Sequence, residues 1–369
     1  MKVNTISLNS VRLNTIALNH IGEIRSGGGG SKPSPIPQWI REHVVFYYDV
    51  KKQGATNETL KESAYLQDLS GKGRRMKLNN FLFAEMSGVG GYNDNFSNWR
   101  TDSNNGVVKI ESDSSIVIQS LKIEYRGVLY QDSTKKATLK CNITGITEEL
   151  KGKLIFRYTD AEGGKNITLE NGYFEFNSSE YEGLSGWYGF SSKQPIDNCN
   201  ITITQIPEYP GALVTDGVDD YGLVENLSSG VKMLFMTVNP IGDFNIGKMY
   251  YSQRYNPIDI TPFYIFTGGN NIAYAGNRDG VTYINGVLNK SITYNELFGV
   301  KHTITTVNDN VKPETSKAPS FFWEEGNAKN YCSRLAFYNS IAFDSIPTEA
   351  DGFTEQELID YVITNIIGQ

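Results

Sequence analysis

Residues 211–230, which read GALVTDGVDDYGLVENLSSG, constrain the fold more than any other stretch of the chain. The apolar residues 212–214 predict a short strand that runs into the pair Asp216-Gly217. Asp-Gly beside alternating apolar residues is a strong short-range signal for a turn between strands. A second apolar strand begins at Tyr221. The stretch therefore predicts two strands joined by a short acidic turn.

Apolar residues at every second position predict further strands in the middle of the chain. The alternating segments contain Leu121, Ile123 and Tyr125; Leu139, Cys141 and Ile143; Phe156 and Tyr158; Phe174 and Phe176; and Ile201 and Ile203. Such alternation, with Gly and Asn between the segments, is typical of a β-sandwich. The 22 Tyr, 18 Phe and 36 Gly residues, with only 20% charged residues, also favour an all-β chain with many turns.

Local signals from residue 231 onward predict four strands and a helix. Residues 231–238 are apolar on both faces, as expected of a central strand, and residues 334–343 alternate. Asn285-Gly286 lies between two short apolar runs and predicts a hairpin. A capping box and one apolar stripe predict a C-terminal helix, its residues being Thr354 and Glu357, then Leu358, Tyr361, Val362 and Ile366.

Four phrases also carry a resemblance to a known family. They are VVFYYDV from Val44, DLSGKG at residues 68–73, the DGVDDY phrase, and the closing strand with its T-x-x-E-L helix. Together they resemble the concanavalin A-like (laminin-G-like) jelly rolls, over roughly residues 44–88 and 211–367. In that family the DGVDDY strand normally follows the opening strands closely. The long separation here therefore implies an insertion.

We expect a mainly β fold with a short C-terminal helix and an extended N-terminal anchor. The resemblance implies a concanavalin A-like jelly roll over residues 39–92 and 210–369. An inserted β-sandwich is expected over residues 93–209, because loops accept insertions at little cost. Residues 26–38 are Gly-rich and then Pro-rich, which is typical of a linker.

Residues 1–25 are a candidate anchor with a five-residue repeat. The gaps between their apolar residues alternate between three and two, which fits neither a helix nor a strand. These residues are Val3, Ile6, Leu8, Val11, Leu13, Ile16, Leu18 and Ile21. One coil of a repeat cannot bury its own apolar face and needs neighbours to stack on. We expect assembly with other subunits or docking on a capsid or tail protein, and a disordered tail is the alternative.

Charge and cysteine content exclude several classes of protein. A net charge of −7 and an isoelectric point near 5.2 disfavour binding to nucleic acid. No run of 18 apolar residues predicts a membrane span, and the N-terminus lacks the features of a secretion signal. Cys141, Cys199 and Cys332 are expected as buried core residues in a chain that is made in a reducing cytoplasm.

The chain carries few residues that favour catalysis. Asp216 and Asp219 are candidate ligands for a calcium ion, although stabilisation of the turn is the simpler interpretation. His20, His43 and His302 have no accompanying nucleophile motif and are expected to be structural. The E-x-D-x-x-E signature of jelly-roll glycoside hydrolases is missing. We therefore expect no enzymatic activity and, calcium apart, no cofactor.

Sugar binding is the more plausible chemistry for this composition. Such sites combine an aromatic face for the C–H surface of the sugar with Asn, Asp and Arg for its hydroxyls. Candidate residues are Trp99, Trp187, Tyr274, Asn277, Arg278 and Trp323. Each is also a candidate core residue, because aromatic side chains dominate the cores of β-sandwiches.

The layout of an anchor, a linker and β domains resembles structural proteins of tailed phages and prophages of gut Bacteroidetes. This resemblance implies an oligomeric head or tail fibre of the virion, made in the host cytoplasm, whose body holds host surface glycans. A bacterial cell-surface carbohydrate-binding protein is the first alternative, and a glycan-cleaving tailspike is the second. A purely structural role without a ligand also stays open.

Overall fold

The structure is a computed structural model. It describes residues 37–135, 138–227, 230–242, 249–254, 264–267, 273–275, 281–288, 294–308, 316–322, 332–352 and 354–368. As predicted, the chain is mainly β, and a short helix lies near the C-terminus. All strand pairs in the described sheets are antiparallel. The candidate anchor, residues 1–25, and most of the linker lie outside the described residues.

The chain forms two compact units. Unit 1 comprises the described residues up to Phe83, Ser87–Val89, and those from Gly211 onwards; unit 2 comprises Ala84–Met86 and Gly90–Pro210. Within unit 1, strand β4 (Gly88–Val89) pairs with strand β15 (Leu213–Val214). The chain therefore leaves unit 1 and returns to it through two neighbouring antiparallel strands.

The larger sheet of unit 1 has eight strands in the order β22-β21-β23-β17-β25-β15-β4, and β1 also pairs with β25. The further bounds are β22 Val287–Leu288, β21 Val281–Ile284, β23 His302–Val307, β17 Met233–Pro240, β25 Leu335–Phe343 and β1 Val44–Asp49. All eight residues of β17 are buried, and β17 lies between β23 and β25. This confirms the central strand that was predicted at residues 231–238.

The second sheet of unit 1 has seven strands in the order β2-β3-β16-β24-β18-β19-β20. Their bounds are β2 Tyr65–Leu66, β3 Met76–Asn79, β16 Tyr221–Val224, β24 Ser316–Phe321, β18 Met249–Arg254, β19 Tyr264–Thr267 and β20 Ala273–Ala275. One core cluster joins the two sheets. It combines Phe46, Met236 and Phe337 of the larger sheet with Tyr251 and Phe321 of the smaller one. Unit 1 is therefore a two-layered β-sandwich.

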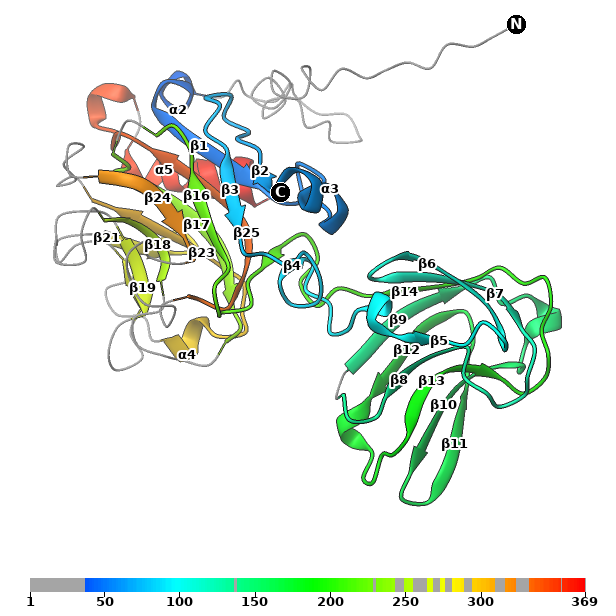
Figure 1. Cartoon of the computed structure of the whole chain (residues 1–369). Helices are drawn as coiled ribbons and strands as arrows, with labels where there is room; N and C mark the ends of the chain where they lie inside the picture. The colour runs from blue at the N-terminus through cyan, green and yellow to red at the C-terminus, as the bar shows by residue number, and fades with distance from the viewer. Residues whose placement is uncertain are drawn as a thin grey trace, which may run out of the picture. The chain divides into compact units, whose positions relative to one another are not determined.

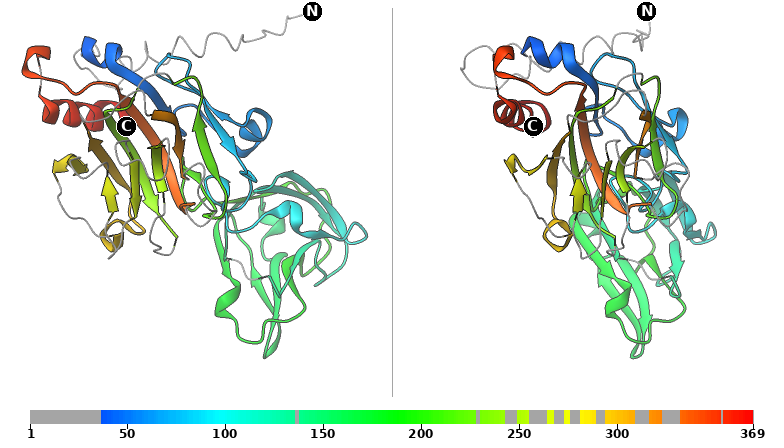
Figure 2. Two further views of the ribbon diagram at one scale, coloured as in Figure 1. Left: turned by 60° about the vertical axis from the view of Figure 1, so that its left-hand side comes forward. Right: turned by 90° about the vertical axis from the view of Figure 1, so that its left-hand side faces the viewer.

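The predicted C-terminal helix is confirmed. Helix α5 (Glu355–Tyr361) begins after a capping box of Thr354 and Glu357 and continues as a π-helical turn over Val362–Ile367. Its buried residues pack on Phe235 and Ile341, on the face of the larger sheet that points away from the sandwich core. Figures 1 and 2 show α5 beside this sheet.

The other helices are short. The α-helices are α2 Gln38–His43, α3 Asn57–Ser63 and α4 Tyr294–Leu297, and the 3₁₀ turns are Phe96–Asn98, Glu148–Leu150, Ser178–Glu180 and Glu349–Asp351. The side chain of Trp39, in α2, packs on Phe343 with their ring centroids 5.4 Å apart. Helix α2 thus lies in the same apolar layer as α5.

Unit 2 is a sandwich of two five-stranded sheets (Figure 1). The first has the order β12-β9-β14-β7-β6, with β12 Gly172–Asn177, β9 Thr138–Thr144, β14 Ile201–Gln205, β7 Ser115–Leu121 and β6 Gly106–Ser112. The second has the order β11-β10-β13-β8-β5, with β11 Gly163–Thr168, β10 Leu154–Asp160, β13 Trp187–Ser192, β8 Leu129–Asp132 and β5 Arg100–Thr101. Four of the five alternating segments that were predicted here coincide with β9, β10, β12 and β14.

The fifth predicted segment, residues 121–125, is wrong. Strand β7 ends at Leu121, and Ile123 and Tyr125 are about 40% exposed. The reason is Asn105, whose backbone oxygen accepts from the Lys122 amide at 2.5 Å and whose side-chain oxygen accepts from the Ile123 amide at 2.7 Å. These bonds replace the strand pairing that the alternation predicted.

Candidate functional site

The acidic turn lies between two strands of unit 1, as predicted, but these strands belong to different sheets. Strand β15 is in the larger sheet and β16 is in the smaller one. The Asp216 Oδ1 accepts hydrogen bonds from the amides of Val218 and Asp219, at 2.7 and 3.3 Å. Gly217 has φ +77°, a conformation that favours glycine. Asp216 therefore holds the turn that carries the chain from one sheet to the other.

Asp220 is the buried member of this turn and is fully shielded from solvent. Its Oδ2 accepts from the Asp216 amide at 2.8 Å, and its Oδ1 accepts from the Ser87 hydroxyl at 3.1 Å. The Ser87 hydroxyl oxygen accepts in turn from the Leu82 amide at 2.9 Å. Burial, which the hydrogen bond from the Asp216 amide only partly offsets, raises the pKa of Asp220 to about 7.

Asp216, Asp219 and Asp220 bring one carboxylate oxygen each within 4.8 Å of the other two. Asp216 and Asp219 were the predicted metal ligands, and Asp220 was not predicted. A calcium ion needs six to eight oxygen ligands. Here both oxygens of Asp220 and one of Asp216 already accept hydrogen bonds from the turn and from Ser87. These contacts favour turn stabilisation over metal binding as the role of the cluster.

Trp99 belongs to the core of unit 2 and is only 4% exposed. Its ring stacks on Phe190, with centroids 5.9 Å apart, and meets Phe96 and Tyr188 edge to face. A side chain enclosed in this way has no ring face free for a ligand. The structure therefore corrects the assignment of Trp99 to a binding site.

Trp187 lies on the solvent side of unit 2. Along β13 the side chains of Tyr188 and Phe190 enter the core, so Trp187 and Gly189 face outward. The half-buried Trp187 ring lies 5.6 Å from the ring of Tyr130, in β8. Tyr130 was not predicted as a ligand residue, because only the pairing of β8 with β13 brings the two rings together.

The other predicted ligand residues belong to unit 1, and the structure describes only one of them. Tyr274 belongs to β20, where its backbone pairs with that of Phe266. Asn277, Arg278 and Trp323 lie outside the described residues.

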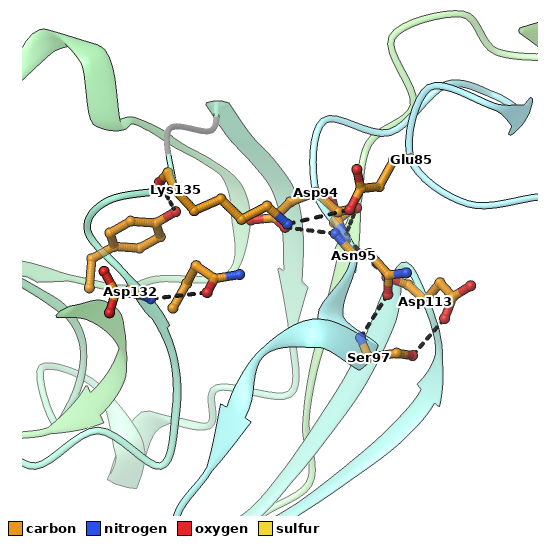
Figure 3. Close-up of polar contacts among 10 residues, drawn as sticks. Glu85, Asp94, Asn95, Ser97, Asp113, Asp132 and Lys135 are labelled. Carbon is orange, nitrogen blue, oxygen red and sulfur yellow. Dashed lines mark hydrogen bonds and ion pairs between the residues drawn. The ribbon is translucent and has the colours of Figure 1, made fainter. Parts of the chain in front are cut away.

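A second polar cluster lies inside unit 2 (Figure 3). The Lys135 Nζ lies 3.0 Å from Asp94 Oδ1 and 3.3 Å from Glu85 Oε1. The Asp94 side chain is completely buried, whereas that of Lys135 is 35% exposed. Burial lowers the pKa of Lys135, but the hydrogen bonds and charges of Asp94 and Glu85 more than offset this, so the net shift is upward. The cluster ties Ala84–Met86 to the rest of unit 2.

The histidines and cysteines that can be placed have structural settings. The His43 Nδ1 lies 3.0 Å from Asp344 Oδ1, and the His302 Nδ1 lies 3.2 Å from Asn285 Nδ2. His20 lies outside the described residues. Cys141, Cys199 and Cys332 form no disulfide and are buried, which confirms the prediction of buried core residues.

Comparisons with protein-family models, with characterised proteins and with solved structures give no match for this chain. None of the helices in the described parts of the chain has both the length and the apolar character to cross a membrane, in agreement with the prediction.

Proposed function

We propose that this chain is a structural protein of a phage particle, a head or tail fibre that is anchored by residues 1–25. Its β units are displayed outward and hold glycans of the host surface. In this account the chain is made in the host cytoplasm, oligomerises through its N-terminal repeat and docks there on a capsid or tail protein. The eight apolar residues of that repeat, in a segment too short to bury them alone, support the assembly.

The observation that carries the proposal is the way in which unit 2 is attached to the chain of unit 1. Strands β4 and β15 pair directly before and after unit 2, with Val89 opposite Leu213. Asp220 joins both sides of this pairing, because it bonds Ser87 before β4 and Asp216 after β15. We interpret unit 1 as the concanavalin A-like jelly roll and unit 2 as a β-sandwich inserted in one of its loops. Such an insertion adds a domain for display and leaves the sheets of the jelly roll intact.

The contacts of the one acidic cluster found among the described residues speak against catalysis. A glycan-cleaving tailspike needs two carboxyl groups free to reach a sugar. In the turn at Asp216 the carboxylates accept hydrogen bonds from backbone amides and from Ser87 instead. The turn therefore supports a structural role, and we propose no enzymatic activity.

Light scattering on the full chain and on a shortened chain that begins at Trp39 tests this proposal. We expect a defined oligomer for the full chain and a folded monomer for the shortened one. The same oligomeric state for both chains would contradict self-assembly through residues 1–25. A shared oligomer would assign the interface to the β units, and two monomers would leave only docking on another protein. A cell-surface carbohydrate-binding protein, the main alternative, has no need of an assembling N-terminus.

A further inference from the structure

One face of unit 2 carries a continuous row of outward-pointing positions across all five strands of its second sheet. Pairing registers place Asn166 opposite Arg157, Arg157 opposite Gly189, Gly189 opposite Tyr130, and Tyr130 opposite Arg100. The residues that alternate with them, among them Phe156, Phe190 and Leu129, are in the core. The row therefore lies on the side of the sheet that faces solvent.

Two aromatic rings occupy the middle of this face and pack against two glycine positions. The rings of Trp187 and Tyr130 have centroids 5.6 Å apart and an interplanar angle of 54°. A Cβ atom at Gly127 would lie 3.0 Å from the Trp187 ring and 3.2 Å from the Tyr130 ring. A Cβ atom at Gly189 would lie 2.7 Å from the Tyr130 Cβ. Both rings thus lie close to the backbone because these two positions have no side chain.

Charged groups of both signs flank the two rings. Asp132 pairs with Trp187, and Arg100 pairs with Tyr130 on the neighbouring strand. The Asp132 Oδ1 accepts from the amide and hydroxyl of Thr134, at 2.9 and 2.8 Å, and these bonds lower the pKa of Asp132. Thr134 therefore holds the Asp132 carboxylate as an acceptor, and Arg100, whose charge also acts on Asp132, is a permanently charged donor.

Arg157 provides a second donor, beyond Gly189. Its Nη1 donates to the Tyr125 carbonyl at 2.9 Å, and the guanidinium lies over the Tyr125 ring at 5.5 Å from the centroid. A guanidinium has five N–H donors, so this bond leaves others for a ligand. The orientation of Arg157 is set before any ligand binds.

We propose that this ring pair, with Asp132, Arg100 and Arg157, binds an oligosaccharide. A sugar ring has an apolar C–H face that suits an aromatic side chain, and hydroxyl groups that both donate and accept hydrogen bonds. The face supplies the rings, an acceptor and two donors within one sheet. This inference rests on the proposed glycan-holding function and assigns it to a site. The shared chemistry fits neutral and acidic sugars, and an acidic sugar gains charge-assisted bonds from the arginines.

Tyr173 provides a matched control on the opposite sheet of the same unit. It is 63% exposed, and its hydroxyl bonds to Glu175. Like Trp187 and Tyr130, it points outward from a strand, but the ring contacts found among the described residues do not include it. Loss of an exposed ring can therefore be compared at a site inside the proposed face and at one outside it.

The test is binding of the full chain to an array of oligosaccharides that includes neutral, amino and acidic sugars. We expect at least one class to bind, and Trp187→Ala to weaken that binding by roughly tenfold or more. Tyr173→Ala should leave it unchanged. Arg100→Ala, at an exposed position, should also weaken binding without a loss of folding, and more strongly for an acidic sugar.

Two results would overturn the site. One is that no sugar of any class binds. The other is that binding persists equally in Trp187→Ala and Arg100→Ala chains that remain folded by circular dichroism. Neither result affects the N-terminal assembly, so an oligomer that binds no sugar leaves the structural role in place. Sugar binding by a chain that stays monomeric would instead favour the cell-surface alternative.

Discussion

Replacement of Lys135 by Met should destabilise unit 2 by about 3 kcal/mol. The substitution removes the ammonium group from a completely buried Asp94 and keeps most of the apolar stem. Breaking a buried ion pair by removing one partner typically costs about 3–5 kcal/mol, because the remaining charge is left uncompensated. We expect the lower end of that range, since the Lys135 side chain is 35% exposed and solvent screens part of the interaction.

Native-state hydrogen exchange is the suitable assay, because it reports on each unit separately. Peptides from β9 and β14 follow unit 2, and peptides from β17 follow unit 1. We expect the free energy of opening to fall in the first set and to stay constant in the second. Lys109→Met is the control, because Lys109 pairs with Glu111 at the surface, where a pair contributes about 0–1 kcal/mol.

A loss of stability in Lys135→Met that is no larger than the loss in Lys109→Met would contradict the contribution assigned to the Lys135–Asp94 ion pair. A double variant, Lys135→Met with Asp94→Asn, tests the stated cause. Removing both charges should restore much of the lost stability, whereas a loss due to packing alone would persist in the double variant.

Three further predictions concern the turn and the core. Burial raises the folded pKa of Asp220 to about 7, above the unfolded value near 3.8, so the free energy of unfolding of unit 1 should fall as pH rises from about 4 to about 7. The whole pH dependence amounts to about 4 kcal/mol at most, and Asp220→Asn should flatten it. Urea unfolding of both chains at pH 5 and pH 8 measures the effect. A free energy of unfolding that rises with pH in the native chain would contradict the prediction. Trp99→Ala should cost unit 2 about 3–5 kcal/mol in hydrogen exchange, because its ring fills the core among Phe96, Tyr188 and Phe190, and a loss below about 1 kcal/mol would contradict that placement. Millimolar calcium or EDTA should leave the thermal midpoint unchanged, since the oxygens of Asp220 already accept hydrogen bonds, and a rise with calcium would assign the cluster to metal binding.

Features that depend on neighbours in sequence could be predicted. The capping box at Thr354 and Glu357 starts α5 because both partners lie within one helical turn. Asn285 and Gly286 have φ values of +51° and +83°, which a tight hairpin turn between β21 and β22 requires and which these residue types tolerate. In both cases the cause and the effect are a few residues apart.

Features that depend on distant contacts could not be predicted. The bond between Ser87 and Asp220 joins residues 133 apart, and the register between β8 and β13 decides that Tyr130 lies beside Trp187. The alternation at residues 121–125 failed for the same reason, because Asn105 diverts the backbone. Alternation also cannot tell a core ring from a surface ring unless the strand's inner face is known, which is why Tyr130 was missed. Trp99 directly precedes β5, and its place in the core depends on contacts with Tyr188 and Phe190, which are distant in the sequence.

The proposed role in a virion is tested most directly on particles that are released from a host carrying this gene. The particles would be purified on a density gradient, and peptides of this chain would be counted by mass spectrometry against the major capsid protein. The account predicts a fixed copy number per particle, which is lost from the particles when residues 1–25 are deleted. Recovery of the chain only in the cell envelope or in the soluble cytoplasm, with none in the particles, would contradict it.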